Sequence, residues 1–253
     1  MRVPHHASNR RRAVTPGAPC RRPTDKRQHV IHRSPLTSKD QHRSVEHVVV
    51  VGAGGFGRET LDVLDADPSA PTVLGVVDDA PRAIDLDRLA ARRVRYLGTL
   101  REWSATAPPE VQYVLAVGAP DVRQRLVASA PLAGRQAATA VHPSATIGSQ
   151  VKLAAGVVIC AGVHISTNVQ LGAHTHVGAG AILGHDTVTA PSVSINPAAV
   201  VSGSVSIETG VLVGAGATIL QGIILRSNST VGAAACVTRD VDPGAVVKGV
   251  PAR

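Results

Sequence analysis

The strongest constraint on the fold is a six-residue repeat that runs without interruption from residue 141 to residue 237. Every sixth position carries an aliphatic side chain, with one threonine as the exception. These positions are Val141, Ile147, Leu153, Ile159, Ile165, Leu171, Val177, Leu183, Thr189, Ile195, Val201, Ile207, Val213, Ile219, Leu225, Val231 and Val237. An α-helix needs apolar residues about every 3.6 positions, and an ordinary strand does not carry a turn residue every six. The pattern therefore predicts a solenoid.

In such a solenoid each hexad supplies one short strand and one corner, so three hexads make a triangular coil of 18 residues. Seventeen hexads predict five to six coils, with the aliphatic side chains stacked inward and the coils about 4.8 Å apart. The next position is often a glycine, which fits a corner, and an aromatic content of 2% fits thin aliphatic layers. The six-residue period does not determine the handedness of the coil. Parallel crossovers are normally right-handed, so a right-handed β-helix stays open.

The repeat resembles that of the hexapeptide-repeat acyltransferases. The resemblance implies a left-handed parallel β-helix that packs as a homotrimer, and we expect it over residues 140–240. The last segment, 241–253, is expected to lie over the final coil as a C-terminal tail.

A second pattern precedes the repeat. The apolar run Val48–Val51 predicts a buried strand, a glycine-rich turn follows at residues 52–57 (GAGGFG), and Glu59–Asp65 has helical spacing. Such a strand–turn–helix unit offers backbone N–H groups to a phosphate. Further strands are predicted at residues 73–77 and 111–117, followed by acidic residues and by a glycine.

These elements predict a small Rossmann-like α/β domain over residues 45–139 that binds the nucleotide part of a sugar nucleotide beyond the ends of its strands. The candidate substrate-binding residues are Gly54, Gly55, Phe56, Asp78, Asp79 and Gly118. An NAD-linked dehydrogenase is a competing interpretation, although the segment holds only about half of a full dinucleotide fold. A second competing interpretation is a degenerate domain that merely packs on the β-helix.

The motifs of the α/β domain and of the repeat are more specific together than either set is alone. The strings VVVVGAGGFGRE, VVDD, LAVG, GHD within the repeat and VVKGVPAR at the end closely resemble the family of sialic acid O-acetyltransferases and UDP-bacillosamine-type sugar N-acetyltransferases. The similarity covers about residues 46–253. It implies acetyl-CoA as co-substrate, a sugar or nucleotide sugar as acceptor, and a homotrimer.

The segment Leu183–Asp186 (LGHD) contains the candidate catalytic residues. Acetyl transfer to an amine or hydroxyl needs a base, and a histidine with a pKa of about 6.5 can serve at neutral pH. Asp186 is expected to orient the imidazole of His185, which requires a corner because adjacent strand residues point to opposite faces. Gly203, one coil further on, is expected beside His185. The resemblance makes His185 the base and directs the Gly203 N–H to the thioester carbonyl.

The resemblance also implies contacts with acetyl-CoA. Small residues at 213–217 and 231–235 would leave a shallow groove for a pantetheine arm, or they are ordinary corner packing. The candidate cofactor-binding residues are Ser194, Gly203, Ala215 and Ala233. Ser194 stands where the family often has a second histidine, and Phe56 where some relatives have histidine.

The net charge of +8 arises in residues 1–44, which hold eleven Lys and Arg against two Asp. This basic tail is poor in apolar residues, and we expect it to be disordered. The tail is either an arm that binds nucleic acid or anionic lipid, or a solvated extension. No aromatic residues are interleaved with its charges, so we expect no nucleic-acid partner. The sequence shows no apolar run of about 18 residues for a membrane span. Three widely spaced cysteines fit reduced thiols in the cytoplasm.

The sequence thus predicts direct transfer of an acetyl group from acetyl-CoA to a sugar or nucleotide sugar, with no covalent intermediate. Two other functions stay open: a non-catalytic scaffold that binds a nucleotide sugar, and a β-helix zinc carbonic anhydrase. The second needs three histidines on one metal ion. The spacings of the histidines do not resemble that family's, so no metal is expected, and a structural role is expected at His142, His164, His174 and His176.

Overall fold

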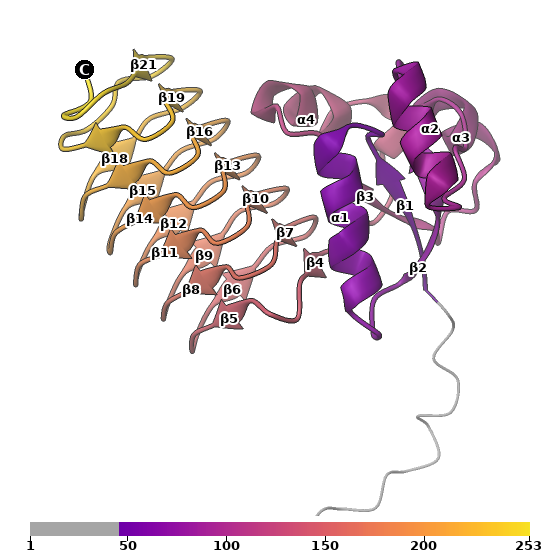
Figure 1. The fold of residues 1–253 in the computed structure, drawn as a ribbon, viewed down its shortest axis with the longest axis horizontal. Coiled ribbons are helices and arrows are strands. Elements are labelled where there is room, and N and C mark those ends of the chain that lie inside the picture. Colours follow the sequence, from indigo (N-terminus) through magenta and orange to yellow (C-terminus); the bar gives the residue numbers. More distant parts are fainter. Residues whose placement is uncertain (1–45) are drawn as a thin grey trace, which may run out of the picture. The chain divides into compact units, whose positions relative to one another are not determined.

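The computed structural model describes residues 46–253, and the predicted disordered tail at 1–44 lies outside the described residues. A small α/β domain comes first (Figure 1). Its elements are β1 (His47–Val51), α1 (Gly55–Ala66), β2 (Thr72–Val77), α2 (Ala83–Ala91), α3 (Leu100–Thr106), β3 (Gln112–Leu115), α4 (Pro120–Val127) and a 3-10 turn (Ala130–Leu132).

The three strands of this domain form a parallel sheet in the order β2-β1-β3. Its valine run is continuous because both faces of the central strand are covered. One face packs against α1 and against Val158 and Cys160 of the second part of the chain. The other face packs against Trp103 and Leu132. The strand order reverses between β1 and β3, which opens a crevice at the carboxyl ends of the strands.

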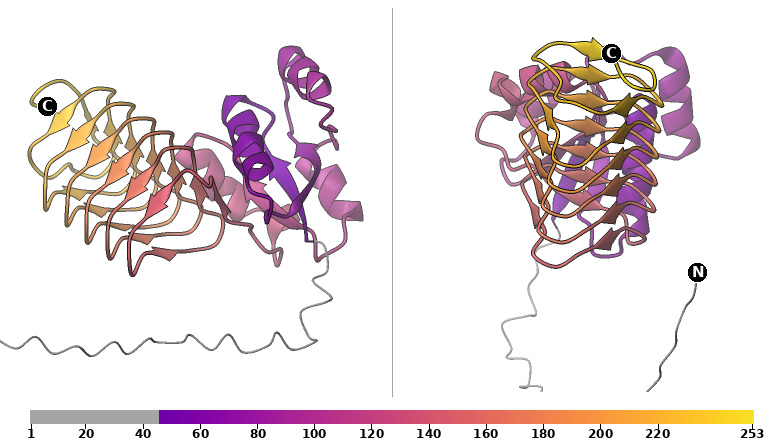
Figure 2. Two further views of the ribbon diagram at one scale, coloured as in Figure 1. Left: turned by 60° about the horizontal axis from the view of Figure 1, so that its bottom comes forward. Right: turned by 90° about the vertical axis from the view of Figure 1, so that its left-hand side faces the viewer.

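The rest of the chain is a parallel β-solenoid with three faces (Figures 1 and 2). Face 1 consists of β4 (Ala140–Val141), β7 (Val158–Ile159), β10 (His176–Val177), β13 (Ser194–Ile195), β16 (Leu212–Val213), β19 (Thr230–Val231) and β21 (Val246–Val247). Face 2 consists of β5 (Thr146–Ile147), β8 (His164–Ile165), β11 (Ile182–Leu183), β14 (Val200–Val201), β17 (Thr218–Ile219) and β20 (Cys236–Val237). Face 3 consists of β6 (Lys152–Leu153), β9 (Gln170–Leu171), β12 (Val188–Thr189), β15 (Ser206–Ile207) and β18 (Ile224–Leu225).

Strands of one face pair at the predicted interval. His176 pairs with Ser194 and Ile182 with Val200, and each pair is one 18-residue coil apart. The aliphatic ladder lines the core, as at Leu183, which is fully buried. The predicted fold class, a β-helix behind a small Rossmann-like domain, is confirmed.

The structure adds a second inward ladder that the sequence analysis did not identify. It lies two residues before each ladder position and consists mostly of small side chains, as at Val157, Ala181 and Val193. The one threonine of the main ladder is also accounted for. The buried Thr189 hydroxyl accepts a hydrogen bond from the Gly172 amide at 3.0 Å, so the polar group is satisfied.

The glycines that follow ladder positions have a different role from the one expected. Gly184 does not adopt a left-handed backbone conformation. A Cβ atom there would lie 2.5 Å from the amide nitrogen of Gly203 on the next coil. Close stacking of coils, rather than turn geometry, therefore requires glycine at this position.

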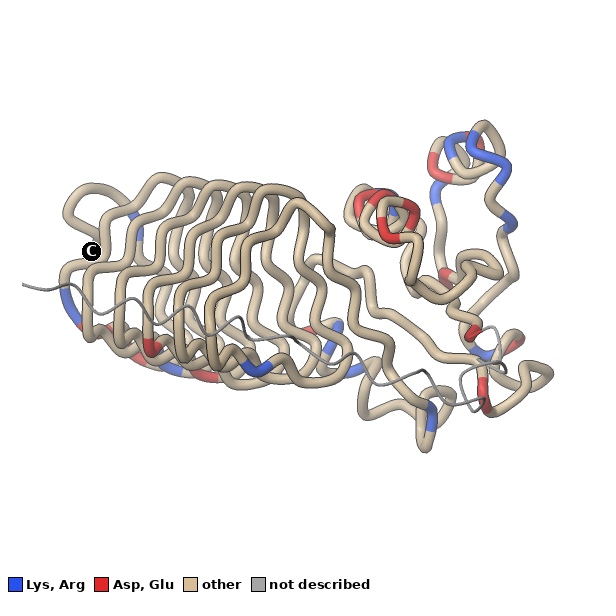
Figure 3. Tube along the Cα trace, turned by 90° about the horizontal axis from the view of Figure 1, so that it is seen from below, with Lys and Arg blue, Asp and Glu red and all other residues tan. Residues whose placement is uncertain are grey.

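The four charged residues between positions 140 and 235 all border face 3: Lys152, Asp186, Glu208 and Arg226. Figure 3 shows the charged residues of the solenoid gathered mainly along one edge. Faces 1 and 2 are consequently almost free of charge over this range, and such surfaces can pack against other protein surfaces without desolvating ions.

Coil pairing continues past residue 240. Val246 of β21 pairs with Thr230, a separation two residues shorter than the usual 18. The amide of Ala252 then donates to the carbonyl of Cys236 at 2.7 Å, which holds the end of the chain on the last coil. No helix within residues 46–253 is long and apolar enough to cross a lipid bilayer.

Candidate active site

His185 lies at the corner between faces 2 and 3, directly after β11. Its side chain is half exposed. Asp186 adopts a left-handed backbone conformation with φ of 60°, which turns its carboxylate back toward its own neighbour. Nδ1 of His185 lies 2.7 Å from Oδ2 of Asp186. The corner therefore allows the contact between adjacent residues that a straight strand would not.

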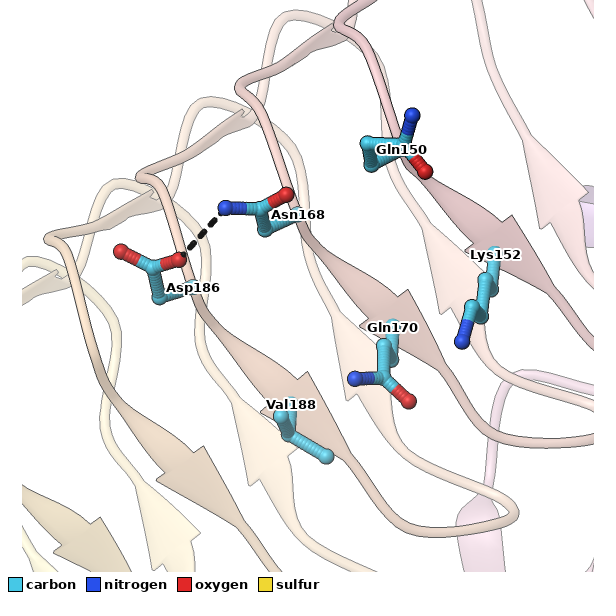
Figure 4. Close-up of a pocket in the computed structure, with 6 residues that line it drawn as sticks. All are labelled: Gln150, Lys152, Asn168, Gln170, Asp186 and Val188. Atoms are coloured by element: carbon cyan, nitrogen blue, oxygen red, sulfur yellow. Dashed lines mark hydrogen bonds between the residues drawn. The ribbon is translucent and has the colours of Figure 1, made fainter.

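A third side chain completes this group. Nδ2 of Asn168, one coil earlier, donates to Oδ1 of Asp186 at 3.0 Å (Figure 4). The hydrogen bonds with His185 and then with Asn168 lower the pKa of Asp186 below its usual range. The ionised carboxylate accepts only, so Nδ1 of His185 carries the proton of the neutral ring. Nε2 has no hydrogen-bond partner within residues 46–253 and can act as a base.

Gly203 lies against the imidazole, as the 18-residue coil predicts. A Cβ atom at this position would be 2.5 Å from both Cε1 and Nε2 of His185. Any side chain at position 203 would therefore displace the ring from its present place.

An open pocket of about 340 Å³ lies beside the pair on face 3. Figure 4 shows its six residues on neighbouring coils. They are Gln150, Lys152, Asn168, Gln170, Asp186 and Val188. The pocket is polar, and its two charged lining residues, Lys152 and Asp186, are of opposite sign.

Of the predicted contacts with acetyl-CoA, Gly203 lies beside His185, whereas the other three lie elsewhere on the same chain. Ala215 and Ala233 are exposed at the corner between faces 1 and 2, after β16 and β19. His185 occupies the next corner, so one chain does not bring these residues to its base. Ser194 is buried on face 1, where its hydroxyl donates to the carbonyl of Gly118 at 3.0 Å.

The α/β domain has a pocket of about 240 Å³ at the carboxyl ends of its strands. Its lining residues are Val51, Gly52, Asp78, Asp79, Ala80, Leu100, Val117, Val122 and Leu126. Both predicted aspartates also hold the surrounding loops. Oδ2 of Asp78 accepts from the amide of Ala53 at 2.7 Å, and Oδ1 of Asp79 accepts from the amide of Leu100 at 2.8 Å.

The glycine-rich turn leads into α1, whose N-cap residue Gly54 has no capping side chain. The first N–H groups of that helix are therefore open to an acceptor. A Cβ at Gly54 or Gly55 would meet no atom within 4 Å, so both border open space. Phe56 instead points toward the solenoid and stacks on His176 with ring centroids 4.5 Å apart.

A smaller cavity lies between the two domains. Its lining residues are Phe56, Glu59, Gly118, His176, Gly178, Ser194, Ile195, Asn196 and Pro197. Burial holds the pKa of His176 well below its usual range, so the ring is neutral. Neither ring nitrogen has a hydrogen-bond partner among the described residues.

Arg123 is not among the residues predicted from the sequence, yet it is fully buried and its hydrogen bonds join the two domains. A charged residue in a short helix is typical of a solvated face, so the sequence held no signal for it. Nor do residues 46–253 bring together three His, Cys, Asp or Glu side chains that could hold a metal ion. Burial raises the pKa of the Cys160 thiol to about 12, which leaves it unreactive.

The chain thus combines a three-sided β-solenoid with a small α/β domain, and a histidine–carboxylate pair lies on one corner of the solenoid. Residues 47–130 match the PglD N-terminal domain family. No curated protein is significantly similar in sequence.

Solved structures are similar over most of the chain. A variant of perosamine N-acetyltransferase from Caulobacter crescentus, in complex with CoA and GDP-perosamine, is 26% identical with a TM-score of 0.73, covering 83% of this chain and 97% of that one. The acetyltransferase domain of PglB from Neisseria gonorrhoeae FA1090, in complex with acetyl coenzyme A, is 25% identical with a TM-score of 0.74, covering 82% and 98%. WeeI from Acinetobacter baumannii AYE shares the fold at 23% identity, with a TM-score of 0.71 and coverage of 82% and 99%. The resemblance to hexapeptide-repeat sugar acetyltransferases is confirmed.

Proposed function

We propose that the protein is an acetyl-CoA-dependent acetyltransferase that acts on an amine or hydroxyl of a nucleotide sugar, with His185 as general base. The observation that carries the proposal is the His185–Asp186 pair beside Gly203, with Nε2 free on an exposed corner. The solved neighbours support acetyl-CoA as co-substrate, because their structures contain CoA or acetyl coenzyme A. The GDP-perosamine in one of them favours an amino sugar on a nucleoside diphosphate as the acceptor.

The reaction follows from these groups. Nε2 of His185 removes a proton as the acceptor nitrogen or oxygen attacks the thioester carbonyl carbon. The backbone N–H of Gly203 stabilises the negative charge that develops on the carbonyl oxygen. The carbon–sulfur bond then breaks, and the proton passes to the departing thiolate of CoA. Asp186 stabilises the imidazolium that forms between these steps.

A second protomer is needed to complete this site. The α/β domain covers face 1, since Val158 and Cys160 belong to its core. His185 occupies the corner opposite face 1, so the nucleotide pocket and the base of one chain lie on different sides of the coil. We propose a homotrimer in which the His185 corner of one protomer meets the acceptor and acetyl-CoA groups of its neighbour.

Apolar side chains around His185 support this assembly. Ile182 on face 2 and Val188 on face 3 are 43% and 42% exposed, and they flank the histidine on both sides. Their burial against another copy would stabilise the assembly by about 25 cal/mol for each Å² removed from water. The corner with Ala215 and Ala233, whose side chains are small and exposed, leaves room for the pantetheine arm between two protomers.

The proposal is tested with purified protein, acetyl-CoA and a panel of amino-sugar nucleotides and sialic acid, by following release of the CoA thiol. His185→Ala is expected to lower kcat by about 10²–10⁴-fold without changing the assembly state. His142→Ala, which alters a histidine of the first coil, is the matched control and should keep wild-type turnover. Unchanged turnover in His185→Ala would refute the assignment of the base.

The other functions predict different results. A non-catalytic scaffold would bind a nucleotide sugar but release no thiol with any acceptor of the panel. A zinc enzyme would contain stoichiometric metal on elemental analysis. The cytoplasmic location stays a prediction, and it fits the free thiols of Cys160 and Cys236.

A further inference from the structure

Arg123 of α4 is fully buried and bridges the α/β domain and the solenoid. Its side chain donates hydrogen bonds to carbonyl groups and one hydroxyl, and no carboxylate pairs with it among the described residues. Burial lowers the pKa of the guanidinium to about 10, so it stays charged at neutral pH. A buried charge without an ion-pair partner is costly unless every donor is satisfied.

Each of its five N–H donors has an acceptor. Nη1 donates to the carbonyls of Val117 and Gly118 at 2.9 and 3.0 Å. Nε donates to the carbonyl of His174 at 3.1 Å, and Nη2 donates to the carbonyl of Val193 at 3.0 Å and the hydroxyl of Ser194 at 2.9 Å. The guanidinium has no N–H left for a phosphate, so it acts through the groups it holds.

Ser194 makes the bridge tighter. Its hydroxyl accepts from Arg123 and donates to the carbonyl of Gly118 at 3.0 Å. The Gly118 carbonyl is therefore held by two donors at once, one from its own domain and one from the solenoid. The loop after β3 cannot move away from face 1 without breaking both.

The segment that is held forms one wall of the pocket at the strand ends. Val117, Val122 and Leu126 line that pocket, and the last two belong to the helix that carries Arg123. Gly118, next to Val117, lines the smaller cavity between the domains. The position of this wall is thus set by hydrogen bonds to the solenoid, at His174 just before β10 and at Val193 and Ser194 around β13, as well as by contacts within the α/β domain.

We propose that Arg123 and Ser194 are positioning residues for nucleotide binding, which lock the Val117–Gly118 loop and α4 onto the solenoid. The inference rests on the nucleotide-binding part of the proposed function and not on acetyl transfer. We expect that loosening the bridge weakens binding of the nucleotide part of the acceptor. The buried Ser194 hydroxyl is bonded to Arg123 and Gly118 and is therefore not open to acetyl-CoA. The other predicted contacts with acetyl-CoA, at Gly203, Ala215 and Ala233, lie at corners of the coil outside the bridge, so we expect acetyl-CoA binding to stay unchanged.

Ser194→Ala is the main test, since it removes one hydrogen bond to Gly118 and one acceptor of Arg123 while leaving the backbone intact. Ser229→Ala is the matched control. Ser229 is also a fully buried solenoid serine, and its hydroxyl has no partner among the described residues. Binding of GDP and of UDP is measured by titration calorimetry. For the nucleotide that binds more tightly, Ser194→Ala should raise Kd about threefold to tenfold, and Ser229→Ala should stay within twofold.

Kinetics separate positioning from a general structural effect. With the acceptor found in the panel, Ser194→Ala should raise KM for the nucleotide sugar by a similar factor and leave KM for acetyl-CoA within twofold. Arg123→Lys keeps the charge but offers three donors in place of five, so we expect it to weaken nucleotide binding at least as much. If Arg123→Lys does not fold, the result for Ser194→Ala alone decides whether the bridge positions the nucleotide site.

Three outcomes overturn the inference: neither nucleotide binds the wild type, Ser194→Ala binds like Ser229→Ala, or the two KM values rise together. Absence of acetyl transfer with every acceptor, alongside weakened nucleotide binding in Ser194→Ala, would refute the proposed enzyme activity and still support the bridge.

Discussion

Substitution of Gly203 by alanine should separate catalysis from stability. The added Cβ would lie 2.5 Å from Cε1 and Nε2 of His185, whereas ordinary contacts begin at 3.4 Å. The ring must therefore move by roughly 1 Å. The His185 side chain is half exposed, and among the described residues its hydrogen bond is to Asp186, so the ring can rotate outward without shifting the coil. A misplacement of about 1 Å costs on the order of 10²-fold in rate.

The same change should hardly affect folding. Gly203 does not adopt a left-handed conformation, so alanine is compatible with its backbone. Alanine also reduces the entropy of the unfolded chain, which favours folding by about 0.4–1 kcal/mol. We therefore expect kcat to fall about 10²-fold while the midpoint of thermal unfolding stays within about 3 °C of the wild type.

The assay is thiol release with saturating acetyl-CoA and acceptor, combined with thermal unfolding followed by circular dichroism. Gly180→Ala is the control with the opposite pattern. Gly180 has φ of 67° and open space around its missing Cβ, so alanine there should cost about 1–2 kcal/mol of stability and leave kcat unchanged.

The double variant tests the mechanism itself. If Gly203→Ala acts by displacing the ring, it should slow His185→Ala no further, because the residues act as one unit. A Gly203→Ala protein that keeps kcat within threefold, or a further large loss in the double variant, would refute this reasoning.

Two further predictions concern assembly and pH. Ile182→Glu should convert the proposed trimer to monomers and abolish turnover, because a charge would be buried at the interface. Light scattering after gel filtration measures the assembly state, and a persistent trimer would place the interface elsewhere. Burial lowers the pKa of both His174 and His176 in the folded state, so the unfolded chain binds protons first as the pH falls. Stability should therefore decrease below about pH 6.5, by up to about 1.4 kcal/mol per pH unit for each histidine, and hold steady above it. Urea unfolding between pH 5 and 7.5 checks this, and a profile that is flat over that range contradicts it.

Much of the solenoid could be predicted because its information is local. A side chain that points inward every six residues sets the coil length, and the coil length decides which residues become neighbours. The stacking of Gly203 on His185 follows from their separation of one coil, as does the pairing of Ile182 with Val200. No long-range complementarity enters these relations, since each coil repeats the contacts of the last.

Other features of the site could not be predicted from the sequence. The contact between His185 and Asp186 depends on a left-handed corner residue, a conformation that the repeat does not specify. The period places Ala215 in a coil, but only the structure shows that its corner is not the one that carries His185.

The sequence by itself determined the coils, their register and the neighbours of the candidate base. Only the tertiary structure decided how the α/β domain lies on face 1. That arrangement depends on shape and on desolvation at Arg123, whose five donors find acceptors on both domains. In the sequence Arg123 looks like a solvated residue of a short helix, because the groups that satisfy a buried charge come together only when distant segments pack.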